Sequence, residues 1–263
     1  MLKNIIILFA ITVVSLSSCS QSLNCNLDSS RRTRITSMDV SNSYSCYMEM
    51  KRGWHTYDGS GALIHPRVII TAGHNLAYFP IVRNIPFLMF RGTRKIDLYF
   101  GSIDSTHFIS SSTIKLKKGK SKFFKSWYWI YPTIKRDYSI IILPDSSIYK
   151  KVGGCYKLKP IKNVNSITSQ IHITGSPGDK NNFEMWTDST ANFRVENASL
   201  RYDLFTAPRN SGSPIWTRTK DGLQLVGVHS RGFGSCNASV LIDEEVYNEV
   251  VKWCKTVGIT LDK

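Results

Sequence analysis

Long hydrophobic runs are almost absent from this 263-residue sequence, which excludes a protein with several membrane-spanning helices. The one exception is the apolar run from Ile5 to Leu16, which is short for a spanning helix and follows Lys3. A positive residue, a short apolar run and then small residues are typical of a secretory signal peptide. We therefore expect residues 1–20 to be a signal peptide that takes no part in the fold.

The signal ends in Leu16-Ser17-Ser18-Cys19, which resembles a bacterial lipobox. Two outcomes stay open. In one, Cys19 carries a lipid and anchors the protein to the cell envelope. In the other, cleavage a few residues further on removes Cys19. We expect a secreted, extracellular protein, with the anchored lipoprotein as the alternative and a membrane as partner only in that case.

Acidic residues are also scarce, with 19 Asp and Glu against 34 Lys and Arg, so that the formal net charge is +15. It falls to +14 when the signal peptide takes Lys3 with it. A positive field favours the approach of acidic substrates. A basic run from Lys115 to Lys125 precedes the aromatic segment WYWIY at 127–131, which could suggest a nucleic-acid surface. We favour a solvated loop before a buried strand and expect no nucleic-acid partner.

No pair of cysteines has the CxxC spacing, which leaves a zinc site without support. No acidic ligand cluster is evident either, so we expect no metal or organic cofactor, with a calcium requirement left open. Five cysteines remain after Cys19, and in an oxidising compartment they could form two disulfides and one free thiol. Their pairing is left open. They are Cys25, Cys46, Cys155, Cys236 and Cys254.

Helical periodicity is missing from nearly the whole chain. Short apolar or alternating runs recur instead, such as GALI (61–64), YSIIIL (138–143) and LQLVGVHS (223–230), and turn residues separate them. This pattern predicts an all-β barrel or sandwich. Only residues 244–256 have apolar side chains at helical spacing, which predicts one amphipathic helix at the end of the chain.

Three short segments carry residues suited to nucleophilic catalysis. His74 ends the strand-like IITAGH, Asp137 precedes the apolar YSIIIL, and Ser211 lies in the small-residue turn NSGSP. A serine hydroxyl needs a neighbouring imidazole to take its proton, and the imidazole needs a carboxylate to orient it. Small residues around the serine allow backbone N–H groups to stabilise an oxyanion, worth roughly 3–4 kcal/mol per donor. Each segment alone is a weak signal, but together they predict a catalytic triad.

With these motifs the sequence resembles the chymotrypsin-fold serine proteases, and more narrowly the secreted glutamyl endopeptidases of the staphylococcal V8 and Bacillus type. The resemblance covers residues 28 to about 256. The serine and histidine motifs are widespread among proteases, whereas the PGDK and YDLFT segments narrow the resemblance to this branch. The matching segments are RTRIT (32–36), GSGALI (59–64), TAGH (71–74), GSPGDK (175–180) with MW (185–186), and YDLFT (202–206).

The resemblance implies two packed six-stranded antiparallel β-barrels followed by a C-terminal α-helix. It implies a serine endopeptidase that works through an acyl-enzyme, with His74 as general base, Asp137 as its partner and Ser211 as nucleophile. We expect an N-terminal segment (21–45) packed on the barrels, a first barrel (46–145) with His74 and Asp137, a second barrel (146–242) with Ser211, and a helix at 243–258. We expect a monomer whose substrates are proteins or peptides with acidic residues.

The resemblance also implies the specificity site. His229 and Thr206 match the residues that bind the side chain before the cut bond, and Ser230 is assigned to the same site. An imidazole and a hydroxyl can donate hydrogen bonds to a carboxylate, whereas a pocket for basic residues would need an acid there. We therefore predict cleavage after Glu, and less well after Asp. The alternative is a trypsin-like protease of another specificity.

The sequence departs from the family at Arg209, where the backbone N–H is expected to form the oxyanion hole together with that of Ser211. The family usually has glycine there, and a positive φ at an arginine would cost on the order of 1–3 kcal/mol. Either the Arg209 N–H still reaches the oxyanion and its side chain lies over the cleft, or the loop collapses. The second outcome would leave a protease-like binding module of little or no activity. A further departure is Asn75, because the cysteine whose disulfide often brackets the histidine is absent.

Overall fold

The computed structural model describes residues 23–37, 39–78, 91–116, 123–125, 133–167, 170–233 and 235–261. The signal peptide with Cys19 lies outside the described residues, as do most of the basic run and the WYWIY segment. Within the described part, no helix is long and apolar enough to cross a membrane.

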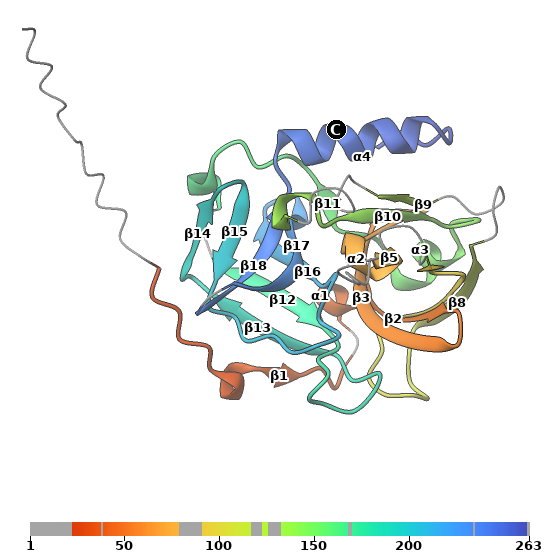
Figure 1. Ribbon diagram of the computed structural model, residues 1–263, viewed down its shortest axis with the longest axis horizontal. Coiled ribbons are helices and arrows are strands. Elements are labelled where there is room, and N and C mark those ends of the chain that lie inside the picture. Colours follow the sequence, from red (N-terminus) through yellow and green to blue (C-terminus); the bar gives the residue numbers. More distant parts are fainter. Residues whose placement is uncertain are drawn as a thin grey trace, which may run out of the picture.

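Two curled sheets lie side by side and make up most of the protein (Figure 1). The first sheet has seven antiparallel strands in the order β8–β7–β2–β3–β4–β10–β9. Strands β2, β3 and β4 follow one another along the chain and are neighbours in the sheet. They are β2 (Ser45–Arg52), β3 (His55–His65), β4 (Val68–Thr71), β7 (Lys95–Phe100), β8 (Ser110–Lys115), β9 (Phe123–Lys125) and β10 (Ser139–Ile142). The short strands β5 (Ala77–Tyr78) and β6 (Arg91–Gly92) form a separate pair.

The second sheet has nine strands, of which eight follow the order β1–β13–β12–β16–β17–β18–β15–β14. The ninth, β11, is parallel to β17, whereas the other pairs are antiparallel. The strands are β1 (Thr33–Arg34), β11 (Lys157–Leu158), β12 (Ile171–Gly175), β13 (Trp186–Thr190), β14 (Phe193–Glu196), β15 (Ser199–Tyr202), β16 (Pro214–Thr219), β17 (Gly222–Phe233) and β18 (Cys236–Leu241).

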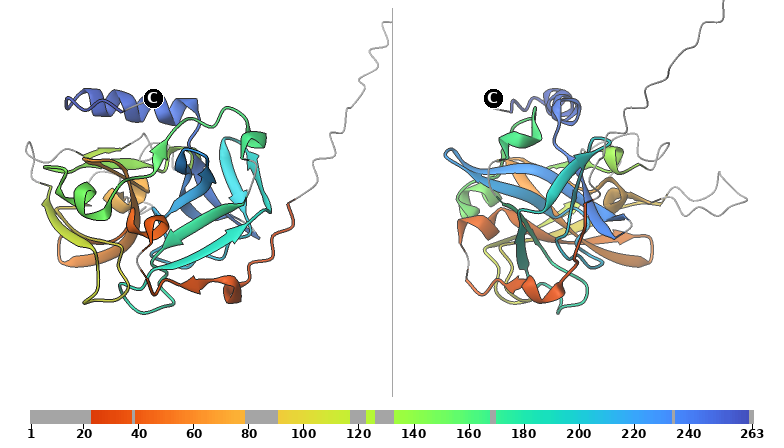
Figure 2. Two further views of the ribbon diagram at one scale, coloured as in Figure 1. Left: turned by 180° about the vertical axis from the view of Figure 1, so that it is seen from behind. Right: turned by 90° about the vertical axis from the view of Figure 1, so that its left-hand side faces the viewer.

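The last helix, α4 (Glu244–Lys255), lies along one side of both sheets (Figure 2). The Asp243 side chain caps its first turn by accepting a hydrogen bond from the Val246 N–H at 2.9 Å. Val246 and Val250 are buried in the main core, as the spacing predicts. The other helices are short: α1 (Val40–Ser43), α2 (Gly73–Leu76), α3 (Ser147–Val152) and the 3-10 turns η1 (Ser29–Arg31), η3 (Ile134–Arg136) and η4 (Val164–Ser166).

The predicted architecture of two antiparallel β-barrels and a C-terminal helix is confirmed, although the sheets hold seven and nine strands rather than six each. The nine strands of the second sheet include β1 and β11, which are two residues long and too short for a sequence pattern to register. The predicted domain boundaries at residues 45, 145 and 242 stay predictions. They agree with β2 beginning at Ser45 and β18 ending at Leu241.

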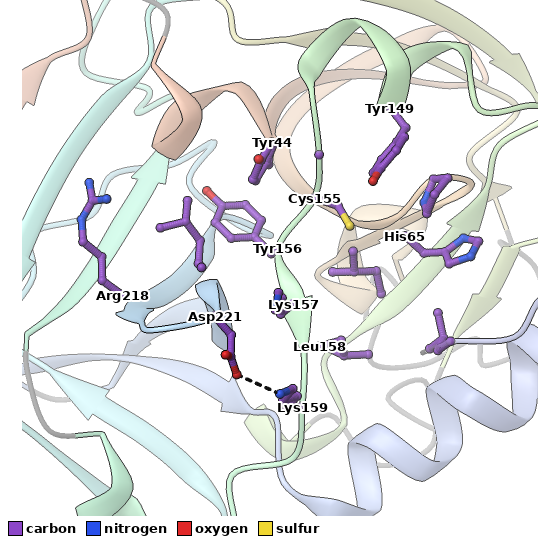
Figure 3. A pocket seen from close by; sticks show the side chains of 16 residues that line it. Tyr44, His65, Tyr149, Cys155, Tyr156, Lys157, Leu158, Lys159, Arg218 and Asp221 are labelled. Carbon is purple, nitrogen blue, oxygen red and sulfur yellow. Dashed lines mark hydrogen bonds and ion pairs between the residues drawn. The ribbon is translucent and has the colours of Figure 1, made fainter. Parts of the chain in front are cut away.

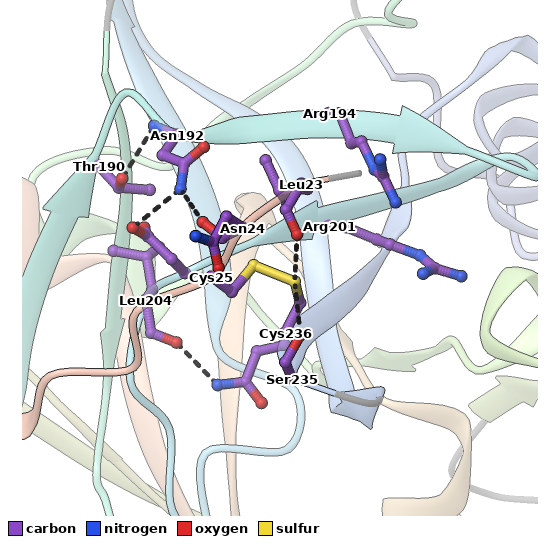
Figure 4. The surroundings of a disulfide bond; sticks show 12 residues. Leu23, Asn24, Cys25, Thr190, Asn192, Arg194, Arg201, Leu204, Ser235 and Cys236 are labelled. Atoms are coloured by element: carbon purple, nitrogen blue, oxygen red, sulfur yellow. Dashed lines mark hydrogen bonds between the residues drawn. A yellow bond between two sulfur atoms is a disulfide. The ribbon is translucent and has the colours of Figure 1, made fainter. Parts of the chain in front are cut away.

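One disulfide joins Cys25 of the N-terminal segment to Cys236 at the start of β18 (Figure 4). The sequence left room for a second disulfide, but Cys46, Cys155 and Cys254 are not disulfide-bonded within the described part of the chain. Cys46 and Cys254 are buried in the main hydrophobic core, where each packs as a small apolar side chain. Burial also raises the pKa of the Cys254 thiol to about 11.

Candidate active site

The pairing of β4 with β10 brings His74 and Asp137 together. Ser139, which begins β10, pairs with Thr71, which ends β4. His74 follows Thr71 by three residues in α2, and Asp137 precedes Ser139 by two, so both side chains come from the same end of the two strands. The antiparallel register therefore places residues 63 positions apart in contact.

Asp137 holds the His74 imidazole and its backbone at the same time. One carboxylate oxygen lies 2.7 Å from Nδ1 of His74, and the other accepts the His74 backbone N–H at 2.9 Å. Ser230 donates its hydroxyl to the first oxygen. Complete burial raises the pKa of Asp137, but the nearby imidazole and these hydrogen bonds outweigh it, so that the pKa lies below its usual value. Asp137 is therefore ionised at neutral pH and orients the imidazole.

Ser211 lies in the loop between β15 and β16 and faces the same pocket as His74. This pocket of about 310 Å³ is lined by both residues and by Asn75, Arg52, Tyr57, Met50 and Asp58. The Ser211 hydroxyl lies 3.5 Å from the carbonyl oxygen of Ser230, at the limit of a hydrogen bond. The structure thus places His74, Asp137 and Ser211 around one site.

The loop around Ser211 leaves two backbone donors free. The N–H groups of Asn210 and Gly212 donate to the carbonyls of Ala207 (3.2 Å) and His229 (2.8 Å). By contrast, the N–H groups of Arg209 and Ser211 have no acceptor anywhere in the described part of the chain. Both residues are partly exposed, so that these two N–H groups, one on either side of Asn210, can donate to a bound substrate. They have the arrangement of an oxyanion hole.

Arg209 has the positive φ that its position requires, 74°, although it is not glycine. Its side chain points to the segment 177–182, where it donates to the carbonyls of Pro177 at 3.0 Å and Lys180 at 2.6 Å. It also donates to the side chain of Asn182. The loop has therefore kept the two free donors, and the arginine side chain is fixed on a neighbouring loop of the second barrel.

His229 lies in β17 and is almost completely buried. Its Nδ1 lies 2.7 Å from the hydroxyl of Tyr202. Burial and the nearby His74 lower the pKa of His229 to about 3, with Asp137 acting weakly in the opposite direction. The imidazole is therefore neutral at neutral pH. Its backbone pairs with the Ser211 loop through the Ser213 carbonyl at 2.9 Å, which places His229 next to the nucleophile.

Thr206 and Ser230 are the other two residues predicted to bind substrate. Thr206 is partly buried in the loop before Ser211, and its role stays a prediction. Ser230 uses its hydroxyl for Asp137, which leaves its backbone for any contact with substrate.

Sequence reasoning missed the residues that hold the two sheets together at this site. Ser60 in β3 donates its N–H to the Ser211 carbonyl at 2.9 Å and its hydroxyl to the Arg209 carbonyl at 3.0 Å. Asn75 donates its side-chain amide to the same Ser211 carbonyl at 2.8 Å and to Thr71 at 2.9 Å. The absence of a cysteine at position 75 was the one signal, and Asn75 supplies a hydrogen bond between the barrels there.

The segments that narrowed the resemblance attach the N-terminal segment to the second barrel. Arg32 forms a two-bond ion pair with Asp179 of the PGDK segment, at 2.9 and 2.6 Å. Arg31 donates to the backbone carbonyl of Asp203 in YDLFT at 2.6 Å and lies 3.4 Å from its carboxylate. Asn192, beside the disulfide, donates to the Asp203 carboxylate and to the Asn24 carbonyl (Figure 4). Asp179 of the PGDK segment and Asp203 of YDLFT thus attach the N-terminal segment to the second barrel.

A second pocket, of about 640 Å³, shares no residue with this site (Figure 3). It lies between β11 and the ends of β3 and β16, and Lys159 pairs with Asp221 at its rim. Cys155, which is not disulfide-bonded, also lines it. For metals, the described residues contain no group of three or more His, Cys, Asp or Glu side chains arranged to hold an ion.

No protein-family model matches the chain. Among curated proteins, an extracellular metalloprotease of Bacillus subtilis (strain 168) is 24% identical over 204 residues, which are 75% of this chain and 58% of the relative. A glutamyl endopeptidase of Staphylococcus aureus (strain MW2) is 29% identical over 115 residues, which are 43% of this chain and 34% of the relative. The chain thus spans less than two thirds of the curated relatives it matches.

Two solved structures match nearly their whole length. A Glu endopeptidase in complex with MPD has a TM-score of 0.67 and 24% identity, over 86% of this chain and 96% of that one. The protease Anisep from Arthrobacter nicotinovorans has a TM-score of 0.66 and 13% identity, over 85% and 99%. The predicted resemblance is confirmed: the chain has the chymotrypsin fold of these proteases and is related in sequence to the V8-type glutamyl endopeptidases.

Proposed function

We propose that this protein is a serine endopeptidase that cleaves peptide bonds after Glu, and less well after Asp. The observation that carries the proposal is the pair of free N–H groups at Arg209 and Ser211, next to a serine that shares a pocket with the Asp137-bound His74. Donors of this kind stabilise an oxyanion that forms when the serine attacks a carbonyl. The related curated proteins and structures, two of which are named as glutamyl endopeptidases, support the same activity.

In the proposed mechanism, His74 takes the proton of Ser211 as its oxygen attacks the scissile carbonyl carbon. The resulting oxyanion accepts hydrogen bonds from the N–H groups of Arg209 and Ser211. His74 then passes the proton to the leaving amine, which departs as the carbonyl re-forms in an acyl-enzyme. A water molecule, deprotonated by His74, hydrolyses the ester and regenerates Ser211. Asp137 stabilises the imidazolium in both halves of the reaction.

The Glu specificity rests on His229 and Thr206. Tyr202 keeps its proton because burial raises its pKa well above the ordinary value. If this hydroxyl donates to Nδ1 of the neutral His229, then Nε2 carries the hydrogen and can donate it to a substrate carboxylate. A neutral donor suits a buried site, because it avoids placing a second charge beside His74 and Asp137. The proposed substrates are therefore extracellular proteins or peptides with acidic residues.

We test this proposal by mapping the cut sites that the protein makes in an unbiased peptide mixture by mass spectrometry. Ser211→Ala is the matched control, and a chelator is added in parallel because one relative is named a metalloprotease. Cuts after Glu that persist with chelator and vanish in Ser211→Ala are the expected result. Cuts mainly after Lys, Arg or Phe would replace the specificity with that of another trypsin-like protease. Silence from the folded protein would favour the protease-like binding module.

A further inference from the structure

The side chain of Arg209 and the backbone of the Ser211 loop are joined through one short segment, residues 177–182. Pro208 and Arg209 share a peptide unit, and the Pro208 carbonyl accepts the Gly178 N–H at 2.6 Å. No peptide bond in the described residues is cis. Because a trans peptide unit is planar, its N–H points opposite to its C=O. The Gly178 bond therefore turns the Arg209 N–H away from the 177–182 segment.

The Arg209 guanidinium binds this segment on both sides of Gly178. The same terminal nitrogen donates to the carbonyls of Pro177 and Lys180, and the other donates to Asn182. The contact is close, since a Cβ added to Gly178 would lie 2.7 Å from the Pro208 oxygen and 3.2 Å from Nε of Arg209. Only glycine fits between the loop and the guanidinium.

We propose that Arg209 is a positioning residue whose side chain orients its own backbone N–H. The guanidinium of Arg209 holds residues 177–182 in place. Gly178 of this segment then fixes the peptide unit between Pro208 and Arg209 by donating its N–H to the Pro208 carbonyl. In this orientation the peptide unit presents the Arg209 N–H to the oxyanion. The proposal rests on the proposed function, because it assigns a purpose to the free donors. This role also explains why arginine stands where the family usually has glycine: glycine would relieve the strain at φ 74° but would leave residues 177–182 without the guanidinium contacts.

The N–H group of Ser211 does not depend on a contact of this kind. Ser211 shares its N–H with the peptide unit of Asn210, whose carbonyl accepts the Ser213 N–H at 2.9 Å within the same turn. Of the two peptide units that supply the donors, only the one between Pro208 and Arg209 depends on a hydrogen bond from a separate loop. We therefore expect the arginine side chain to affect one donor of the two.

The experiment compares Arg209→Gly and Arg209→Ala with the parent protein, and uses Arg218→Ala as the matched control. Arg218 is an exposed arginine of the same barrel that stacks on Trp216, 5.4 Å from the ring centre. The kcat and KM are measured on a peptide p-nitroanilide with Glu before the cut bond. Exchange of the Gly178 amide with deuterium is followed by NMR in the Ser211→Ala background of each variant.

We expect kcat to fall about 10- to 100-fold in both Arg209 variants with KM little changed. Complete loss of an oxyanion donor costs about 10²–10³ in kcat, and a donor that is only misdirected costs less. Gly178 exchange should accelerate in both variants, and Arg218→Ala should behave as the parent. The glycine variant separates the role of the side chain from strain, because it restores the favoured residue at a positive φ.

Three results would overturn the proposal. A kcat for Arg209→Gly equal to that of the parent would mean that the arginine is merely tolerated. A lower kcat without faster Gly178 exchange would mean that the side chain does not fasten the segment. If the parent shows no Ser211-dependent hydrolysis, the proposed function fails and the catalytic purpose fails with it, whereas faster Gly178 exchange in the variants would still support the fastening itself.

Discussion

The two barrels contribute to the site in different ways. The first barrel contributes side chains: the His74 imidazole and the Asp137 carboxylate, joined by charge-assisted hydrogen bonds at the ends of paired strands. The second barrel contributes mainly backbone, namely the N–H groups of Arg209 and of the nucleophile Ser211 itself. A side chain can be fixed by its immediate neighbours, whereas the direction of a backbone N–H depends on where the adjacent carbonyls are bonded.

The first barrel also holds the loop of the second. Ser60 and Asn75 both donate to the Ser211 carbonyl, and Ser60 and Asn75 are themselves linked through Thr71. All three side chains are buried, so that these hydrogen bonds form in a low-dielectric interior. The loop that carries the oxyanion donors is therefore held both by the first barrel and by residues 177–182 of its own barrel, whereas Asp137 receives one side-chain hydrogen bond across the barrels, from Ser230. The backbone donors thus depend on contacts from both barrels.

Asp137→Asn removes the carboxylate that the first barrel contributes to the site, and it has the largest expected effect on kcat. An amide at this position can present its N–H₂ to Nδ1 of His74 and so stabilise the wrong tautomer, and it cannot stabilise the imidazolium. We expect kcat on the glutamyl p-nitroanilide to fall about 10⁴-fold with KM little changed. The control is Asp97→Asn, a largely buried carboxylate of the same barrel that binds Lys95 and Thr113. Equal losses in the two variants would mean that Asp137 acts only through stability.

Asn75→Ala removes a side-chain hydrogen bond between the two barrels. It removes one of two donors to the Ser211 carbonyl and leaves the Ser60 N–H, so we expect kcat to fall about 10-fold, less than the loss of a whole oxyanion donor. The matched control is Thr93→Val, which removes a hydrogen bond to the carbonyl of Asn75 (3.2 Å) but leaves the Ser211 carbonyl untouched. Both variants should lose about 1–2 kcal/mol of unfolding free energy. If kcat changes as much in the control, the bond to Ser211 has no particular importance.

The catalytic side chains and the patterned strands could be predicted from the sequence, whereas the supports of the backbone donors could not. His74, Asp137 and Ser211 were found because each follows or precedes a strongly patterned strand, and chemistry demands those residue types. Strands such as β3, β10 and β17 and the helix α4 followed from periodicity, whereas the two-residue β1 and β11 gave no such pattern. In each case the signal is local, or comes from a residue type with few alternatives.

The supports of the oxyanion site gave no such signal. Ser60 acts on Arg209 across 149 residues, and Asn75 on Ser211 across 136. Serine and asparagine are common, and only the packing of two barrels makes these particular ones donors to the loop. Likewise, counting cysteines could not show that Cys25 pairs with Cys236, while Cys46 and Cys254 are enclosed in the core.

Two histidines, one from each barrel, lie near Ser211. His74 is partly exposed, with 25% of its side chain accessible, whereas His229 is enclosed and neutral, with its pKa lowered to about 3. In the unfolded chain a histidine has a pKa near 6.5. Between pH 6.5 and 3 the unfolded state therefore binds a proton that the folded state refuses, and stability falls as the pH falls, by up to about 1.4 kcal/mol per pH unit.

Denaturant unfolding of the Ser211→Ala protein at pH 7, 6, 5 and 4 measures this slope without self-digestion. His229→Gln keeps a polar side chain that does not titrate, so its curve should lose less stability on acidification than that of the parent. His55→Gln, which removes an exposed imidazole from β3, should retain the parent's slope. His172, whose pKa is also lowered by burial, remains in all three proteins and cancels in the comparison. Parallel curves for His229→Gln and the parent would show that the second barrel does not hold a neutral histidine, and the proposed donor to the substrate carboxylate would then need a different protonation state.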